Sequence, residues 1–364
     1  MDKLFSEGRV GSLVLPNRLI RSATAERMAT PAGLVTEPMI DLYRALAAGG
    51  AGLIIAGHSY IRADGRAGPT MSALDRDETI PGWRRLVEAV HDEGGRIAAQ
   101  INHGGRQAMP ALDGTPRAPS PVSLRGVTPQ PLEEDEIWAL VDVCRMAARR
   151  AKQAGFDAVQ IHAAHGYLIS NFNSPFTNRR QDAWGGDVNG RGRFAREVAL
   201  AVRRELGATY PLFIKLNASD GVEGGISRQD AVQIARRLEG AGLDAVEVSG
   251  GTADAIDYAI RRIQPGQEAY FAADARALKQ SLRIPVILVG GIRSFEVASR
   301  LLEDGTADFI SMCRPLIREP DLPRRWQRGE RRAADCISCG LCRKYQDRGV
   351  RCEEMIARPN RSTC

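Results

Sequence analysis

Short apolar runs alternate with longer, helically patterned segments along most of this chain. The apolar runs predict buried strands, because they are short, rich in β-branched residues and bounded by turn residues. These predicted strands are Leu19–Ser22, Gly52–Ala56, Arg96–Gln100, Asp157–Ile161, Leu212–Leu216, Ala245–Val248, Pro285–Val289 and Phe309–Met312.

The segments between the strands carry apolar residues at helical spacing. Thr36 with Pro38 marks one helix start, and Gly94-Gly95 marks one helix end. The predicted helices are Glu37–Ala48, Gly82–Glu93, Glu133–Ala154, Gly192–Leu206, Ser227–Glu239, Ala272–Leu282, Ser294–Glu303 and Asp321–Gln327.

Eight β/α units in succession predict an α/β fold of the (β/α)8 TIM-barrel type. A doubly wound open sheet is the alternative, and it is disfavoured because no strand is followed by a G-x-G-x-x-G turn. We therefore divide the chain into a barrel domain, residues 1–328, and a short tail rich in cysteine and arginine, residues 329–364.

Composition narrows the class of protein. Of the 364 residues, 43% are hydrophobic and 26% charged, as in soluble globular proteins, and no apolar run is long enough to span a membrane. The start of the chain lacks the apolar core of a signal peptide, so we expect a cytoplasmic protein. The net charge of +6 comes from basic residues mixed with acids, which argues against nucleic-acid binding. Seven cysteines do not predict a disulfide framework.

The segment Gln160–Tyr167 is the strongest candidate for chemistry. His162, His165 and Tyr167 follow a predicted strand, at the edge where parallel β/α folds place active sites. The histidine spacing also suits a metal, but no third ligand lies close by in sequence, so donors to a substrate oxygen are favoured over zinc. Tyr167 is a candidate general acid, because a phenol stays protonated at neutral pH; simple loop packing is the alternative.

Polar residues in other strands suggest an anionic, aromatic ligand. Lys215 lies in an apolar strand and needs either an internal carboxylate or an electron-rich ligand. Gln100 suits the pyrimidine edge of a flavin, or is a hydrogen-bonded core residue. Gly290-Gly291 and Arg314 follow the last two strands, where barrels commonly bind phosphate; a tight turn and a surface arginine are the alternative.

Several motifs in order resemble the old yellow enzyme family of FMN-dependent ene-reductases, over nearly all of residues 3–328. The motifs are Leu15-Pro16-Asn17-Arg18, Ser22-Ala23-Thr24-Ala25, Gln100-Ile101-Asn102-His103-Gly104-Gly105-Arg106, His162-Ala163-Ala164-His165-Gly166-Tyr167, Ser174-Pro175-Phe176-Thr177-Asn178-Arg179-Arg180 and Trp184-Gly185-Gly186.

The resemblance implies an FMN site, with NAD(P)H as the hydride donor and a small activated alkene as the substrate. The implied flavin contacts are Ser22, Ala23, Thr24, Ala25, Ala56, Gln100 and Lys215, and the implied phosphate contacts are Gly290, Gly291, Cys313 and Arg314. By the same resemblance, His162 and His165 bind the carbonyl oxygen of the alkene and Tyr167 protonates the carbon beside it. Two departures are Ala25, where many relatives have Thr or Cys, and Lys215, which often is arginine.

The tail carries a second candidate site. Cys336, Cys339, Cys342 and Cys352 are dense enough to suggest a 4Fe–4S cluster or zinc. The tail resembles that of 2,4-dienoyl-CoA reductases and trimethylamine dehydrogenases, so an iron–sulfur flavoprotein is the alternative function. Because the spacing departs from that group, a reduced tail without metal is favoured over a cluster. We expect no nucleic-acid or membrane partner and leave a homo-oligomer open.

Overall fold

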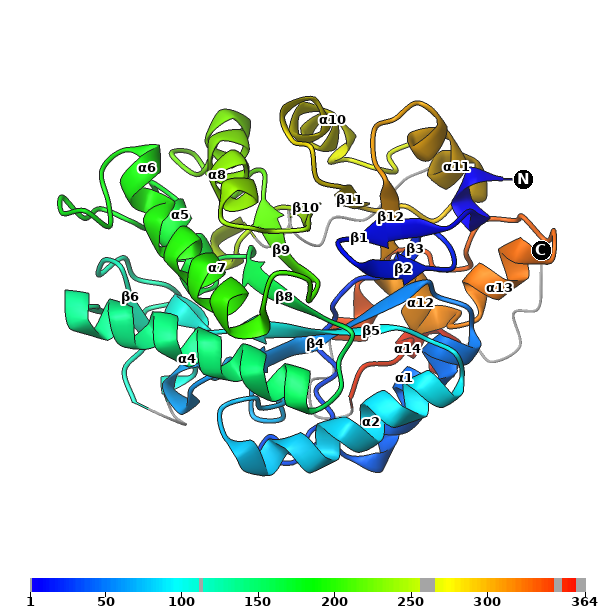
Figure 1. Cartoon of the computed structure of the whole chain (residues 1–364), viewed down its shortest axis with the longest axis horizontal. Coiled ribbons are helices and arrows are strands. Elements are labelled where there is room, and N and C mark those ends of the chain that lie inside the picture. Colours follow the sequence, from blue (N-terminus) through cyan, green and yellow to red (C-terminus); the bar gives the residue numbers. More distant parts are fainter. Residues whose placement is uncertain (1, 111–113, 256–265, 344–348, 358–364) are drawn as a thin grey trace.

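The computed structural model describes residues 2–110, 114–255, 266–343 and 349–357. Eight parallel strands close into a barrel with the order β10-β11-β12-β3-β4-β5-β8-β9, which confirms the predicted TIM barrel (Figure 1). The strands are β3 (Leu19–Arg21), β4 (Leu53–Tyr60), β5 (Ile97–Asn102), β8 (Ala158–Ala163), β9 (Leu212–Asn217), β10 (Ala245–Ser249), β11 (Val286–Val289) and β12 (Phe309–Met312).

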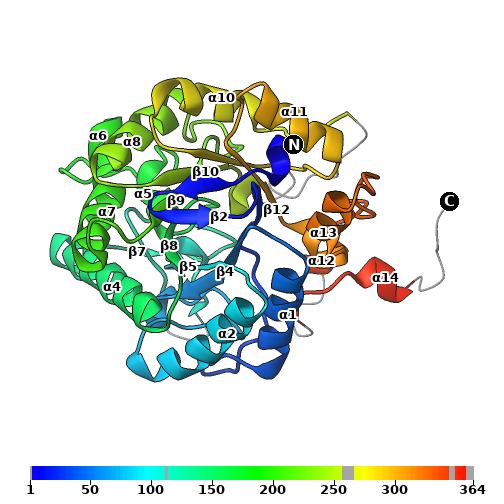
Figure 2. The same cartoon turned by 45° about the vertical axis from the view of Figure 1, so that its right-hand side comes forward.

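Amphipathic helices surround the barrel (Figures 1 and 2). In α7, Phe194, Val198 and Val202 are buried at four-residue spacing, and α8 begins with a reciprocal cap between Ser227 and Asp230. The main helices are α1 (Glu37–Ala48), α2 (Ile80–Asp92), α4 (Glu134–Gln153), α7 (Arg193–Leu206), α8 (Arg228–Gly240), α10 (Ala272–Ser281), α11 (Phe295–Glu303), α12 (Arg314–Arg318) and α13 (Leu322–Gln327).

Several elements were not predicted. A hairpin of β1 (Gly8–Val10) and β2 (Leu13–Leu15) packs Val10 and Leu15 against the first inward residues of the barrel strands, and so closes the amino-terminal end. The other unpredicted elements described are β6 (Arg117–Ala118), β7 (Gln130–Pro131), α5 (Leu168–Asn173), α6 (Val188–Arg191), α12 (Arg314–Arg318), η6 (Leu341–Arg343), α14 (Glu353–Ala357) and short 3-10 turns elsewhere.

Strand β4 is longer than predicted, and this moves His58. The strand continues to Tyr60 through an irregularity between Ile55 and His58, so His58 lies within the strand rather than after it. His162 likewise lies within β8, whereas His103 directly follows β5 and His165 follows β8. Bulges of this kind commonly re-aim a side chain near an active site.

The side chains inside the barrel form three layers, because every second residue of a strand faces the same side. Along β8 these inward residues are Ala158, Gln160 and His162; along β9 they are Phe213, Lys215 and Asn217; along β10 they are Ala245, Glu247 and Ser249. The first layer is apolar and packs on the hairpin. The second layer is polar and buried, and the third reaches the carboxyl ends of the strands.

The polar layer centres on an ion pair. Lys215 Nζ lies 3.1 Å from Glu247 Oε1, and both side chains are almost fully buried. Glu247 also accepts hydrogen bonds from Ser22 Oγ and Ser311 Oγ, each 2.8 Å, and from Gln160 Nε2, 2.8 Å. Gln100 Nε2 in turn donates to Gln160 Oε1 at 2.5 Å. Lys215 therefore has the internal carboxylate that its position in an apolar strand requires.

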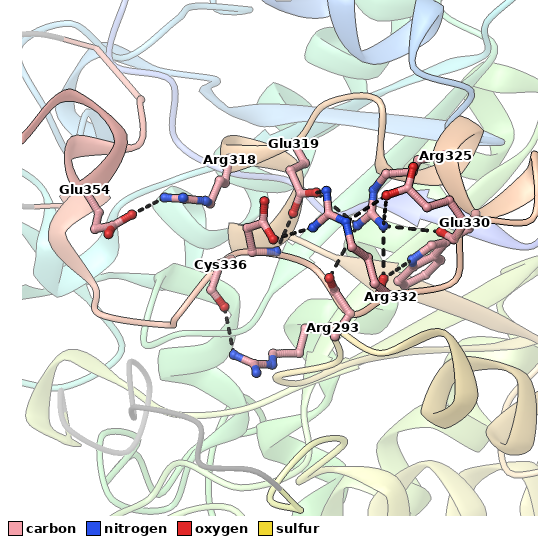
Figure 3. A network of polar contacts seen from close by, with 11 residues as sticks. Arg293, Arg318, Glu319, Arg325, Glu330, Arg332, Cys336 and Glu354 are labelled. Carbon is pink, nitrogen blue, oxygen red and sulfur yellow. Dashed lines mark hydrogen bonds and ion pairs between the residues drawn. The ribbon is translucent and has the colours of Figure 1, made fainter. Parts of the chain in front are cut away.

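The tail is anchored to the barrel by a polar network (Figure 3). Arg318 of α12 pairs with Glu354 of α14, Asp335 N donates to Glu319 Oε2 at 2.5 Å, and Arg293 Nη1 donates to Cys336 O at 3.0 Å. Nearer its end, Val350 N donates to Glu26 O at 2.7 Å. Among the residues that the structure describes, no helix has both the length and the apolar character that a membrane crossing requires. The division of domains at residue 328 stays a prediction.

Replacing Glu247 by glutamine should destabilise the protein strongly. The Glu247→Gln change keeps the shape but leaves the Lys215 cation buried without a carboxylate, which typically costs about 3–5 kcal/mol in the free energy of unfolding. Denaturant unfolding of the wild type and the variant measures it. The Lys215→Met/Glu247→Gln double variant should lose less than the sum of the two single changes. Additive losses, or a Glu247→Gln midpoint equal to that of wild type, would contradict the pairing.

Candidate active site

A cavity of about 300 Å³ opens at the carboxyl ends of the barrel strands. The predicted site residues that line it are Ser22, Ala23, Thr24, Ala25, Gln100, His162, His165, Tyr167, Lys215, Gly291, Cys313 and Arg314. Ala56 and Gly290 are buried in the wall and do not line it. Sequence positions far apart are thus brought to one place by the closure of the barrel.

The floor of the cavity is the polar layer of the barrel. Lys215 Nζ donates to Ser22 Oγ at 2.7 Å. Gln100 belongs to the same hydrogen-bonded layer, because its Nε2 donates to Gln160 Oε1. Burial alone would raise the pKa of the Glu247 carboxyl, but the Lys215 charge and the hydrogen bonds from Gln160, Ser22 and Ser311 outweigh burial and lower it. The floor therefore presents an ammonium group, an amide and a hydroxyl, with the negative charge beneath them.

His162 is a neutral imidazole at the cavity wall. Burial lowers its pKa well below the usual value, helped by the neighbouring His165, His58 and Lys215. Its Nδ1 accepts a hydrogen bond from Ala164 N at 3.3 Å, so in the neutral ring the proton is on Nε2. A neutral imidazole with this tautomer is a hydrogen-bond donor to a ligand oxygen.

His165 is held by the next two strands. Its Nε2 lies 2.7 Å from Ser249 Oγ, and its backbone N donates to Asn217 Oδ1 at 3.0 Å. Its φ of 62° is unusual for a residue other than glycine and fits a side chain held by its surroundings. The rings of His162 and His165 are 5.1 Å apart and perpendicular. His165 Nε2 thus already forms a hydrogen bond with Ser249, a partner that was not predicted from the sequence.

Tyr167 and His58 complete a ring cluster. The Tyr167 ring centroid is 5.0 Å from that of His162 and 5.0 Å from that of His58. Asn102 Nδ2 donates to His58 Nδ1 at 2.9 Å, which leaves the proton of the neutral ring on Nε2. Burial, together with the charge of Arg27, lowers the pKa of His58 to about 4. His58 was not among the site residues predicted from the sequence.

The other end of the cavity suits an anion. Gly291, Arg293 and Arg314 line this end. Arg293 was not predicted from the sequence, although it directly follows Gly290-Gly291-Ile292. Gly290 has a φ of 146°, and a Cβ there would lie 3.1 Å from the Phe271 ring, so the backbone requires glycine. Cys313 Sγ lies 2.9 Å from Thr24 Oγ1.

The residues present fit FMN. A buried cation and amides at the floor match the electron-rich pyrimidine edge of a flavin, while arginines and glycine backbone at the far end match its phosphate. Ser249 at the end of β10 and the loop Gly250-Gly251-Thr252 that follows also line the cavity and were not predicted. Its Gly-Gly pair directly after a strand is the same signal that identified Gly290-Gly291.

The tail cysteines lie near the cavity, and Cys342 lines it. Burial raises the pKa of Cys342 to about 12, with a further contribution from Cys313 and Cys336. Across the described residues 2–110, 114–255, 266–343 and 349–357, no three His, Cys, Asp or Glu side chains gather so as to hold a metal ion. A tail that binds a 4Fe–4S cluster and a reduced tail without metal differ in iron and sulfide content. Analysis of anaerobically purified protein measures both.

The lowered pKa of buried His58 predicts that the free energy of unfolding decreases on acidification. His58 has a folded-state pKa of about 4, so between pH ~6.5 and ~4 the unfolded chain binds a proton that the folded chain does not. Stability therefore falls as pH falls through this window, by up to about 1.4 kcal/mol per pH unit for each such histidine. In His58→Gln this slope should decrease by about that amount. Denaturant unfolding across this range measures it, and an unchanged slope would refute the buried neutral state of His58.

The chain resembles known flavoproteins over most of its length. It matches the model of the NADH:flavin oxidoreductase / NADH oxidase family over residues 3–332. A metal reductase of Desulforamulus reducens is 41% identical over 344 residues, covering 93% of this chain and 51% of that relative. The chain thus spans about half the length of that relative, and 55% of the NADH oxidase of Thermoanaerobacter brockii, which is 39% identical over 96% of this chain.

A solved structure of similar length has the same fold. The old yellow enzyme homologue from Zymomonas mobilis superposes with a TM-score of 0.79 and 30% identity, covering 92% of this chain and 95% of that one. With the family match over residues 3–332, the closed barrel and the cavity at its mouth, these likenesses show that the chain belongs to the NADH:flavin oxidoreductase family of the old yellow enzyme type.

Proposed function

We propose that this protein is an FMN-dependent oxidoreductase that uses NAD(P)H to reduce an activated alkene, an α,β-unsaturated carbonyl compound. The observation that carries the proposal is the meeting of His162, His165 and Tyr167 at one wall of a cavity whose floor is Gln100 and Lys215. Family membership supports the flavin and the nicotinamide donor. The alkene is our inference from the arrangement of donors around the cavity.

The residues that would hold FMN divide into two groups. Ser22, Gln100 and Lys215 would bind the pyrimidine edge, and Gly291 with Arg314 would bind the phosphate, while residues 23–25 would contact the ring. FMN, when bound, supplies hydride transfer between the nicotinamide and the substrate. The negative charge of Glu247 balances the positive charge of Lys215. The ammonium group can therefore donate a hydrogen bond to the flavin without adding net charge to the floor.

The two histidines would bind and polarise the substrate carbonyl. His162 offers Nε2–H from a neutral, buried ring, and His165 stands 5.1 Å away across a perpendicular contact. Donors to the carbonyl oxygen stabilise negative charge that develops there, which makes the β-carbon more electrophilic. His165 would either exchange Ser249 for the substrate or keep it and donate through Nδ1–H.

Tyr167 would deliver the proton. Its hydroxyl is the natural acid of the ring cluster, because phenols in general are protonated at neutral pH. The Tyr167 ring is 5.0 Å from the rings of both His162 and His58, and so lies next to where the carbonyl would be bound. The proton would pass from Tyr167 Oη to the carbon beside the carbonyl.

Removing the two imidazoles should separate the two half-reactions. In His162→Ala/His165→Ala, reduction of the protein-bound FMN by NAD(P)H should stay largely intact. Reoxidation by an enone such as cyclohexenone should slow by about 10²–10³, because oriented donors to a developing oxyanion contribute that much. Anaerobic stopped-flow absorbance measures both rates. An equal loss in both half-reactions would refute the assigned role.

Removing the phenol should affect enones and nitroalkenes differently. In Tyr167→Phe, enone reduction should slow by about 10²–10⁴, because the positioned general acid is lost. Nitroalkenes should still be consumed, with release of the nitronate, which is stable enough to take its proton from water. Product analysis distinguishes nitronate from nitroalkane. If both substrate classes lose activity alike, Tyr167 positions the substrate and the proton comes from elsewhere.

A further inference from the structure

A second cavity adjoins the first at His58 and Tyr167. Its volume is about 80 Å³, and Ala25, Arg27, His58 and Tyr167 line both cavities. The rest of its lining is Glu26 and residues 67–72. The smaller cavity is therefore a side pocket that shares part of its wall, including the proposed proton donor, with the larger one.

The proposed reaction needs a supply of protons. NAD(P)H provides a hydride, so one proton must be taken from solvent for each double bond that is reduced. Once Tyr167 has given its proton to the substrate carbon, its phenolate must be protonated again before the next turnover. The imidazoles are poor sources, because burial lowers the pKa of His162 well below its usual value and that of His58 to about 4. Arg27 cannot serve, since a guanidinium keeps its proton in proteins.

Glu26 is the one carboxyl group among the described residues that line the side pocket. Its side chain is buried, and its Oε1 accepts a hydrogen bond from Gly57 N at 2.6 Å. A Cβ added at Gly57 would collide with Glu26 Oε2, so the carboxyl lies directly against the residue that precedes His58 in β4. Val350 N of the tail donates to Glu26 O at 2.7 Å and fixes its backbone. The acid is thus held at a defined place beside the pocket.

The surroundings of Glu26 favour its protonated form. Burial raises the pKa of the carboxyl, and this effect outweighs the opposing charge of Arg21 and the hydrogen bonds from backbone N–H groups. Within the part of the chain that the structure describes, no cation forms an ion pair with Glu26. A glutamine would accept the same bond from Gly57 without the cost of burying an ionisable group. A buried, unpaired acid in a cleft beside a reactive group is therefore a candidate for proton transfer.

The side pocket has room for water between the two groups. A water molecule takes up about 30 Å³ in the liquid and needs two to four polar partners in a protein. A volume of about 80 Å³ therefore suits about two waters. Glu26, Thr70, Ser72 and Tyr167 bring polar groups to the lining. Water in this pocket would join the carboxyl of Glu26 to the phenol of Tyr167.

We propose, on the basis of the proposed function, that Glu26 restores the proton of Tyr167 through water in the side pocket. After Tyr167 Oη has protonated the substrate carbon, the Glu26 carboxyl gives a proton to a pocket water, and that water gives one to the phenolate. The transfer is favourable, because a phenol is a weaker acid than a carboxyl group. The Glu26 carboxylate then takes a proton from solvent. Over one turnover, NAD(P)H, one proton and the alkene become NAD(P)+ and the saturated carbonyl compound.

The test times flavin reoxidation and proton uptake in the same mixing. Holoenzyme with FMN, reduced by one equivalent of NAD(P)H, is mixed anaerobically with cyclohexenone in weak buffer that contains a pH-indicator dye. In Glu26→Gln, reoxidation should keep the wild-type rate, because Tyr167 begins protonated. Uptake of the solvent proton should slow by about 10²-fold, the contribution typical of a positioned acid. Glu26→Asp, which keeps an acid, should take up the proton much faster than Glu26→Gln.

Tyr43→Phe is the matched control. Gly57 N also donates to Tyr43 Oη, at 2.8 Å, and Tyr43 does not line the side pocket. The change therefore disturbs the same backbone group without removing an acid from the pocket. Proton uptake should keep pace with reoxidation in this variant, as in the wild type. An equal lag in Tyr43→Phe and Glu26→Gln would mean that packing around Gly57 controls the lag, and would overturn the proposal.

The remaining outcomes separate this inference from the proposed function. If proton uptake in Glu26→Gln keeps pace with reoxidation, solvent reaches Tyr167 by another path, and the relay is overturned while the proposed function stands. If reoxidation slows as much as uptake does, Glu26 shapes the site instead of restoring the proton, and the relay is again overturned. A wild-type holoenzyme that cyclohexenone does not reoxidise overturns the proposed function and this inference together.

Discussion

The arrangement of the active site depends on one buried ion pair, Lys215 with Glu247. A lone cation or a lone carboxylate in the interior of a barrel would be strongly destabilising, so each residue requires the other. Their strands are adjacent, and the two residues are direct partners in the β9–β10 register. Through Gln160, Gln100 and Ser311, the pair links five strands just below the cavity, and through Ser22 it also links the residue that follows β3.

Because every second residue of a strand faces the barrel interior, the ion pair lies directly below the residues of the site. Two residues beyond the polar layer on each strand, the same inward face presents His162, Asn217 and Ser249, and the latter two hold His165. Along a single strand, the inward side chains therefore belong first to the apolar core, then to the polar floor of the cavity, and then to the wall of the cavity. This order is expected for the layered interior of a barrel. Burial, helped by the nearby charges of Lys215 and Arg27, keeps His162 and His58 neutral, so each ring offers one N–H donor without a positive charge.

Much of this could be predicted from the sequence, and the failures have physical causes. Apolar runs and helical spacing are local signals, so the barrel was predicted and confirmed, and Lys215 was expected to need a partner. Glu247 was not identified, because pairing depends on which strands become neighbours. The alternation Ala245, Glu247, Ser249 was nevertheless visible, and read beside Phe213, Lys215, Asn217 it would have suggested both Glu247 and Ser249. The β1–β2 hairpin was missed although Gly11-Ser12 between two apolar runs is a local signal for a two-residue hairpin turn.

The central claim is that the cavity above Lys215 and Glu247 is built for FMN. The most direct measurement is the visible absorbance spectrum of the purified protein, followed by titration of the flavin-free protein with FMN. The account predicts a yellow protein that releases FMN on denaturation, rebinds one equivalent, and binds it far more weakly when Lys215 is replaced by methionine. A colourless protein that takes up no added FMN, or one whose affinity is the same in Lys215→Met, would contradict it.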